Sequence, residues 1–135
     1  MKSHGFEELV HTADLAIKVW AADFTSLLWE SAYGMYDLMN IEQNSSYQVT
    51  ATFTIPDGSQ ETILVDFLNE LLFRVEEKME KFDSFSFTRE DEGLEVAAQG
   101  HPIKSVQREI KAVTFHNLDI RETDSGMTTE ITFDV

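Results

Sequence analysis

The chain has 135 residues, 42% of them hydrophobic, which suits one compact domain over residues 1–135 and leaves too little length for two separate cores. Its 25 Asp and Glu residues outnumber its 10 Lys and Arg residues, and the formal charge of −15 excludes a protein that grips nucleic acid directly through the phosphate backbone. It has no cysteine and no apolar run long enough for a membrane span or a signal peptide, so we expect a cytoplasmic protein without disulfides, thiolate metal sites or a membrane anchor.

The first forty residues predict a strand followed by a helix. Over residues 16–21, Ile17 and Val19 alternate with polar or amphipathic side chains, as a half-buried strand requires. Asp23 or Thr25 can then cap a helix that continues to about residue 40. The apolar stripe of that helix repeats every three or four residues and consists of Leu28, Ala32, Met35 and Met39.

A second strand and a second helix follow. Residues 47–55 alternate apolar residues with Gln or Thr, which predicts a strand with one buried and one hydrated face. The segment Pro56–Gly58 predicts a turn, and Ser59 can cap the helix that comes next. The predicted buried side of this helix consists of Leu64, Leu68, Leu71, Leu72, Val75 and Met79.

Two hairpins are predicted in the remaining chain. Alternation around Phe85–Phe87 and Leu94–Ala98 gives two strands that turn near residues 90–93. Residues 114–122 and 127–135 give two more, joined by a loop whose Gly126 can adopt positive φ. The order of elements predicts an α+β fold: a single two-layer domain with a mostly antiparallel or mixed sheet and two main helices packed on one face.

The residue types that carry most enzyme chemistry show no local signature here. Ser, His and Asp residues are scattered without the motif of a nucleophilic hydrolase, and the glycine-rich loops of nucleotide binders are missing. Zinc coordination is disfavoured because no two histidines have the spacing of metal ligands. The histidines are His4, His11, His101 and His116.

Oxygen ligands for a hard cation are abundant, and two places stand out. Asp14 lies just before the first predicted strand, where His11 can support it. At the other end, Asp134 projects from the polar face of the last strand, and the main-chain carboxylate of Val135 follows one residue later. The same residues also fit a simple turn and a solvated edge strand. If the three anionic groups converge, a bound cation would relieve their repulsion.

Two further sets of charged residues have ordinary structural explanations. Lys111 is notable because lysines are scarce; it can pair with Glu109 or reach toward a phosphate or a partner carboxylate. Asp66 and Glu70 stand four residues apart on the second predicted helix and could form a carboxylate pair. Exposed helix faces carry such pairs routinely, so this site is the weaker candidate.

Four segments, in this order and at this spacing, resemble the archease family over nearly the whole chain. They are Phe6–Asp14, Leu64–Phe73, Glu109–His116 and Ile131–Val135. Two small departures occur: Phe115 stands where the family pattern suggests Tyr, and the edge around Gly100–Pro102 is shortened.

The resemblance implies a protein without chemistry of its own, which activates the RNA-splicing ligase that joins a 2′,3′-cyclic-phosphate or 3′-phosphate end to a 5′-hydroxyl in tRNA splicing. It implies that the protein promotes guanylylation of the ligase's active-site histidine and repeated turnover. The family's metal ligands match Asp14, Asp134 and the Val135 carboxylate, its functional lysine matches Lys111, and His11 fits a supporting role. The expected cofactor is a divalent cation, foremost Ca²⁺, with Mg²⁺ and Mn²⁺ as alternatives.

Two other functions remain open from the sequence. A metal-dependent phosphoester hydrolase would hold its cation between Asp14 and Asp134, and His11 or His116 would transfer protons. A chaperone-like binding module would instead use exposed aromatic residues such as Trp20 or Trp29.

Overall fold

The structure is a computed structural model that describes residues 3–9 and 14–135. Its elements in chain order are β1 (Gly5–Leu9), β2 (Leu15–Ala21), α1 (Phe24–Met39), β3 (Ile41–Gln43), β4 (Val49–Pro56), α2 (Gln60–Lys78), β5 (Glu80–Glu90), β6 (Gly93–Val106), β7 (Ala112–Thr114), β8 (Arg121–Thr123) and β9 (Gly126–Asp134). Two helices combined with antiparallel strand pairs confirm the predicted α+β class. Neither helix in the described part of the chain has the length and apolar run needed to cross a membrane.

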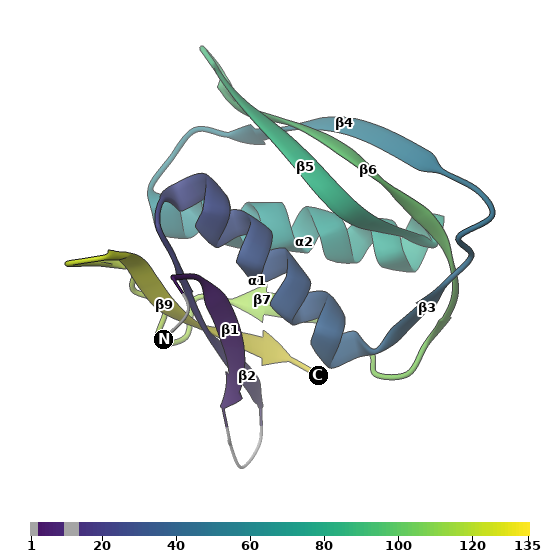
Figure 1. The fold of residues 1–135 in the computed structure, drawn as a ribbon, viewed down its shortest axis with the longest axis horizontal. Helices are drawn as coiled ribbons and strands as arrows, with labels where there is room; N and C mark the ends of the chain where they lie inside the picture. Colours follow the sequence, from purple (N-terminus) through teal and green to yellow (C-terminus); the bar gives the residue numbers. More distant parts are fainter. Residues whose placement is uncertain (1–2, 10–13) are drawn as a thin grey trace.

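The described strands form two sheets, and the helices lie between them. One sheet has the order β1-β2-β9-β7, with β8 added to β9; the other has the order β3-β6-β4, with β5 added to β6. Figure 1 shows α1 and α2 as a middle layer, with β4, β5 and β6 above and β1, β2, β9 and β7 below. The prediction of a single sheet with both helices on one face is therefore wrong, although the class is right.

Helix α1 is apolar on two sides, which explains the two sheets. On one side, the backbone N–H of Phe82 in β5 donates a hydrogen bond to the Tyr36 hydroxyl. On another side, Gly34 lies so close to Ile17 of β2 and Phe6 of β1 that a Cβ there would collide with both side chains. A helix that buries two opposite faces cannot sit on the surface of one sheet.

The predicted cap of α1 is Asp23, whose side chain accepts a hydrogen bond of 2.9 Å from the backbone N–H of Ser26. That bond lowers the pKa of Asp23 below its usual value of 3.8. The helix ends at Asn40, which adopts a left-handed conformation. All four residues of the predicted apolar stripe of α1 are buried.

We predict that Asp23→Ala lowers the free energy of unfolding by about 1 kcal/mol at pH 7, because the helix N-terminus loses its acceptor. Since the folded pKa lies below the unfolded value of 3.8, the contribution of the carboxylate is complete above that value and is lost as the pH falls through the folded pKa. Urea unfolding of Asp23→Asn is the control, because asparagine caps without titrating. Parallel pH profiles for the wild type and Asp23→Asn between pH 5 and pH 3 would contradict this prediction.

Ser59 caps α2 as predicted, because its hydroxyl accepts a hydrogen bond of 3.1 Å from the backbone N–H of Thr62. The predicted buried stripe of α2 is confirmed from Leu64 to Val75. Met79 is the exception: it lies just beyond the helix in a left-handed conformation, with φ of 54° and 44% of its surface exposed. The helical periodicity predicted Met79 to be buried, and this was wrong because the helix ends at Lys78.

The two predicted hairpins are present, with one difference in the second. Strands β5 and β6 pair up to Glu90 and Gly93, and β8 and β9 turn between Thr123 and Gly126. The strand predicted over residues 114–122 is instead two short strands, β7 and β8. Between them, the N–H of Leu118 donates to the carbonyl of Phe115 and Asn117 has positive φ, so the chain turns. The short strands β1 and β3 were not predicted.

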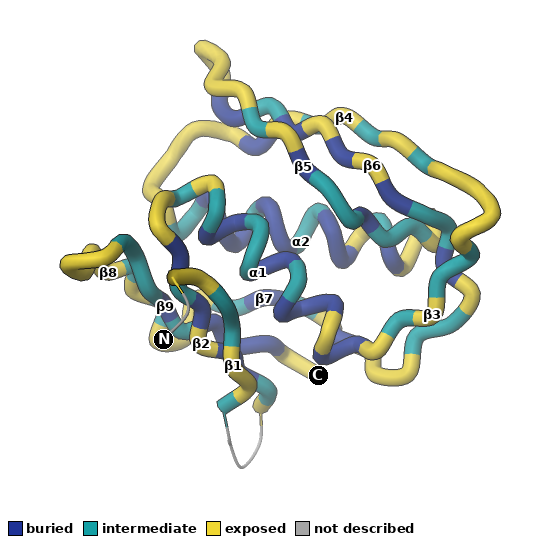
Figure 2. The backbone as a smooth tube through the Cα atoms, viewed as in Figure 1, coloured by how far each residue is buried: buried dark blue, intermediate teal, exposed yellow. Residues whose placement is uncertain are grey.

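The core contains an aromatic cluster between α2 and the upper sheet. Phe67 of α2 is fully buried, and its ring meets those of Phe85 and Phe87 of β5 edge to face at 5.3 and 5.6 Å. Trp29 of α1 packs against Phe85 at 5.6 Å. Trp20 and Trp29 are half-buried, so neither provides the exposed aromatic surface considered above. Figure 2 shows that buried backbone runs through the helices and the inner parts of both sheets.

Candidate functional site

The two aspartates predicted to bind metal lie at the same end of the lower sheet. Strands β2 and β9 are antiparallel neighbours, and their pairing includes Leu15 opposite Phe133. Asp14 directly precedes Leu15 and Asp134 directly follows Phe133, so both aspartates flank the same strand pair. Residues about 120 positions apart in the chain are thus brought side by side by the sheet register.

Both carboxylates belong to the polar face of this sheet end. Phe133 is fully buried, so alternation directs Asp134 away from the core. Asp14 and Asp134 are exposed, and Val135 is 45% exposed. This edge therefore carries two anionic side chains from two adjacent strands, and Val135, the third predicted ligand, follows Asp134 by one residue.

Lys111 lies on the other side of Asp134. Strand β7 pairs with β9 so that Ala112 is opposite Asp134, and the backbone N–H of Lys111 donates a hydrogen bond of 2.8 Å to the Asp134 carbonyl. The Lys111 side chain is exposed and forms no ion pair with any described residue, so it does not pair with Glu109. Its position adds one cation beside the two aspartates.

Helix α2 fixes strand β7 and hence the position of Lys111. The side chain of Asn69 accepts a hydrogen bond of 2.9 Å from the Val113 N–H and donates a bond of 3.5 Å to the Val113 carbonyl. Strand β7 lies at the edge of its sheet, so these two bonds satisfy backbone groups of Val113 that a further strand would otherwise pair with. Sequence reasoning missed this contact, because an Asn within a helix is usually an ordinary surface residue.

A buried hydroxyl lies next to this sheet end. Thr132 is 2% exposed, and its Oγ1 has no hydrogen-bond partner among residues 3–9 and 14–135. It precedes Asp134 by two residues on the same strand, so both side chains belong to the same face. A buried hydroxyl in this state is free to bond to a water molecule or another oxygen ligand.

His11, the predicted supporting residue, lies outside the described residues. Within the described ranges, no three His, Asp or Glu side chains are grouped so that they could hold a metal ion. The sheet end supplies two such side chains, Asp14 and Asp134. Carboxylate oxygens suit a hard divalent cation and disfavour zinc or copper.

The alternative carboxylate pair on α2 has another role. Glu70 forms an ion pair of 2.9 Å with Arg74, so its charge is already balanced without Asp66.

A different polar cluster, which the sequence did not predict, surrounds Asp83 of β5. Its carboxylate lies 3.3 Å from the Lys81 ammonium and 3.4 Å from His101 Nε2. Only the β5–β6 pairing brings His101 to Asp83, so no local motif announces the cluster.

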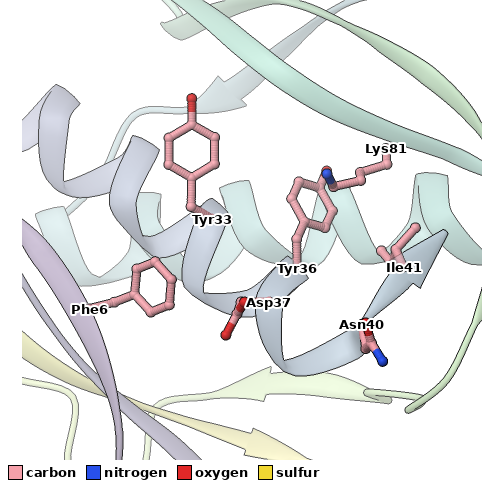
Figure 3. Close-up of a pocket in the computed structure, with 7 residues that line it drawn as sticks. All are labelled: Phe6, Tyr33, Tyr36, Asp37, Asn40, Ile41 and Lys81. Atoms are coloured by element: carbon pink, nitrogen blue, oxygen red, sulfur yellow. The ribbon is translucent and has the colours of Figure 1, made fainter. Parts of the chain in front are cut away.

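A hollow of about 330 Å³ lies between α1, β1 and β5. In Figure 3, Lys81 extends over the ring of Tyr36, whereas Phe6 and Asp37 lie at the other side. The hydroxyls lining it already hold the helix to β5, since Tyr33 donates to the Asp83 carbonyl at 2.8 Å and Tyr36 accepts from Phe82. Burial raises the pKa of Tyr36 well above its usual value, so this phenol stays protonated. The two tyrosine hydroxyls of this hollow therefore stabilise the packing of α1 against β5.

The chain is similar to proteins of one family along almost its whole length. A sequence model of the archease protein family matches residues 6–135. A protein archease from Methanopyrus kandleri is 31% identical, over 96% of this chain and 99% of the relative. A protein archease from Methanosarcina acetivorans is 27% identical, over the full length of both chains.

Two solved structures share the fold. The crystal structure of a Thermotoga maritima archease, described as a possible chaperone, superposes with a TM-score of 0.73 at 21% identity and covers 96% of each chain. The solution structure of Methanobacterium thermoautotrophicum protein 1598 has a TM-score of 0.71 at 25% identity, over 97% of this chain and 99% of the other.

Proposed function

The chain belongs to the archease family, and on that premise we propose that it is a cytoplasmic, non-enzymatic activator of an RNA-splicing ligase. In this proposal it promotes guanylylation of the ligase and repeated turnover, and the nucleotide and RNA chemistry stays in the ligase. The net charge of −15 supports such a role, because a strongly acidic protein is attracted to the basic, RNA-binding mouth of an enzyme.

The single observation that carries the proposal is the pairing of β2 with β9, which sets Asp14 beside Asp134. With the Val135 carboxylate these groups would hold a divalent cation, foremost Ca²⁺, with Mg²⁺ or Mn²⁺ as alternatives.

The residues have separate tasks in this proposal. The two aspartates and the terminal carboxylate would hold the cation, which would supply a positive charge for oxygen atoms of the partner. Lys111, fixed by the bond from its own N–H to Asp134, would bind a phosphate or a carboxylate of the ligase. His11 would support Asp14.

The test compares the activity of the purified protein alone with the activity of a mixture of the protein and an RNA-splicing ligase. We expect the purified protein to hydrolyse no generic phosphoester and to raise the turnover of an RNA-splicing ligase when the two are mixed. Phosphoester hydrolysis by the protein alone would instead identify the hydrolase. Suppression of aggregation of unrelated clients would instead favour a chaperone, for which Tyr47, Phe73 and Phe115 are the exposed aromatic residues of the described chain.

A chain extended by two residues past Val135 separates the terminal carboxylate from Asp134. We predict that the extension weakens divalent-cation binding by at least roughly tenfold, the smallest loss expected even for a residue that only supports a ligand. Isothermal titration with Ca²⁺, Mg²⁺ and Mn²⁺ measures this. Because Asp14 and Asp134 are kept, an unchanged affinity would remove the terminus from the ligand set.

A further inference from the structure

An apolar groove of about 330 Å³ includes Ile110, the residue before Lys111. Its floor consists of side chains that are 2–6% exposed: Met39, Leu72, Val75 and Ile110. They come from the C-terminal ends of α1 and α2 and from the segment between β6 and β7. Figure 1 shows that these parts of the chain gather on the right-hand side of the view, and the C-terminus lies toward that side as well.

Met79 forms part of the rim and adopts an unfavourable backbone conformation. Its φ of 54° is one that glycine occupies freely and that costs a residue with a Cβ, yet its side chain is 44% exposed. The backbone bonds of this position do not require methionine: its N–H bonds to Val75 and its carbonyl accepts the N–H of Ile103 at 2.7 Å. Nothing in the fold explains why a methionine stands at a helix end that suits glycine.

The charges on the rim are negative. Glu76 and Glu109 line the groove, both are exposed, and neither forms an ion pair with any described residue. No lysine or arginine lines it. An apolar floor with an unpaired carboxylate on two sides is complementary to an apolar side chain flanked by basic residues.

The groove is continuous with the site. Ile110 belongs to its floor, and the next residue, Lys111, donates its N–H to the Asp134 carbonyl. A partner that contacts Lys111 is therefore one residue away from the floor of the groove.

From these features we infer that the groove receives a basic amphipathic segment of the partner protein, which seats an apolar side chain against Met39, Leu72 and Met79 and places Lys or Arg next to Glu76 and Glu109. The inference rests on the proposed function and adds the surface by which the partner is held. Methionine suits this task because its flexible side chain adapts to the shape of another protein.

The first test is Met79→Gly. Because glycine relieves the left-handed backbone, this variant should melt at the same temperature as the wild type or higher, while its dissociation constant for the ligase rises roughly tenfold. The matched control is Asn40→Gly, the same kind of change at the left-handed end of α1, which does not line the groove. The control should bind as the wild type does. Equal binding by Met79→Gly and the wild type would overturn the inference.

The second test reverses a rim charge. Glu76→Lys should weaken ligase binding by at least roughly tenfold at low salt, and the loss should shrink as salt is added. Glu77→Lys, one residue further on the same exposed helix surface and outside the groove, is the matched control and should lose much less. Equal losses in both variants would mean that only net charge matters, and would overturn the inference.

Ligase stimulation and ligase binding, measured on the wild type and on the groove variants, distinguish failure of this inference from failure of the proposed function. If the wild type fails to bind or stimulate the ligase, the proposed function fails and the groove loses its partner. If the wild type stimulates and both groove variants match it, only the groove inference fails. Light scattering covers the remaining occupant: a wild-type dimer that Met79→Gly converts to a monomer would assign the groove to a second copy of the chain and overturn the inference.

Discussion

Asp134→Asn is expected to abolish stimulation of the ligase while the protein keeps its fold. The substitution removes an anionic oxygen from the candidate cation site, and the remaining aspartate and terminal carboxylate bind a hard cation much more weakly. Cation affinity should fall by more than roughly 100-fold, the upper range for residues that merely support metal ligands. The melting temperature should stay within a few degrees, because the side chain is exposed and the bond from Lys111 goes to the backbone carbonyl.

Asp124→Asn is the matched control for this experiment. It removes the same charge from an exposed position in the turn between β8 and β9, at the opposite end of the β9 strand. It should bind the cation and stimulate the ligase as the wild type does. Full stimulation by Asp134→Asn, or an equal loss in both variants, would contradict the assignment of Asp134.

The largest effect on stability is expected from Phe67→Ala. Phe67 is fully buried and its ring contacts Phe85 and Phe87, so truncation removes the apolar burial of the largest side chain that joins α2 to β5. We expect a loss of about 3–5 kcal/mol in the free energy of unfolding. In a chain of this length that corresponds to a melting temperature lower by roughly 10–18 °C.

Phe73→Ala makes the same chemical change on the same helix and serves as the control. Phe73 is 50% exposed, so its truncation should cost less than about 1 kcal/mol in urea unfolding. Similar losses in the two variants would show that helix propensity, and not core packing, sets the effect. Helix content by circular dichroism distinguishes those causes.

The elements could be predicted from the sequence wherever periodicity and capping agree. The stripe of α1, the cap Ser59, the alternating strand that became β4 and the hairpin at Gly126 all depend on neighbours within a few residues, and local patterns encode such contacts. Met79 shows the limit of that method: its spacing continues the buried stripe, but the helix has already ended before it.

The arrangement of layers could not be predicted in the same way. Burial of both Gly34 and Tyr36 on α1 requires partners from two sheets, and neither partner lies near the helix in sequence. The nearness of Asp14 and Asp134 also depends on a long-range pairing, and the sequence alone offered only their polar position at strand ends. The apolar groove is built from three segments, and no local pattern in the sequence predicts it apart from Met79 at the end of α2.

The most direct test of the proposed site is anomalous diffraction from crystals soaked in Mn²⁺. We predict a peak within bonding distance of the carboxylates of Asp14 and Asp134 and of the main-chain carboxylate of Val135, and we expect this peak to disappear in Asp134→Asn. A cation bound only elsewhere on the protein, or a peak that survives the substitution, would contradict it.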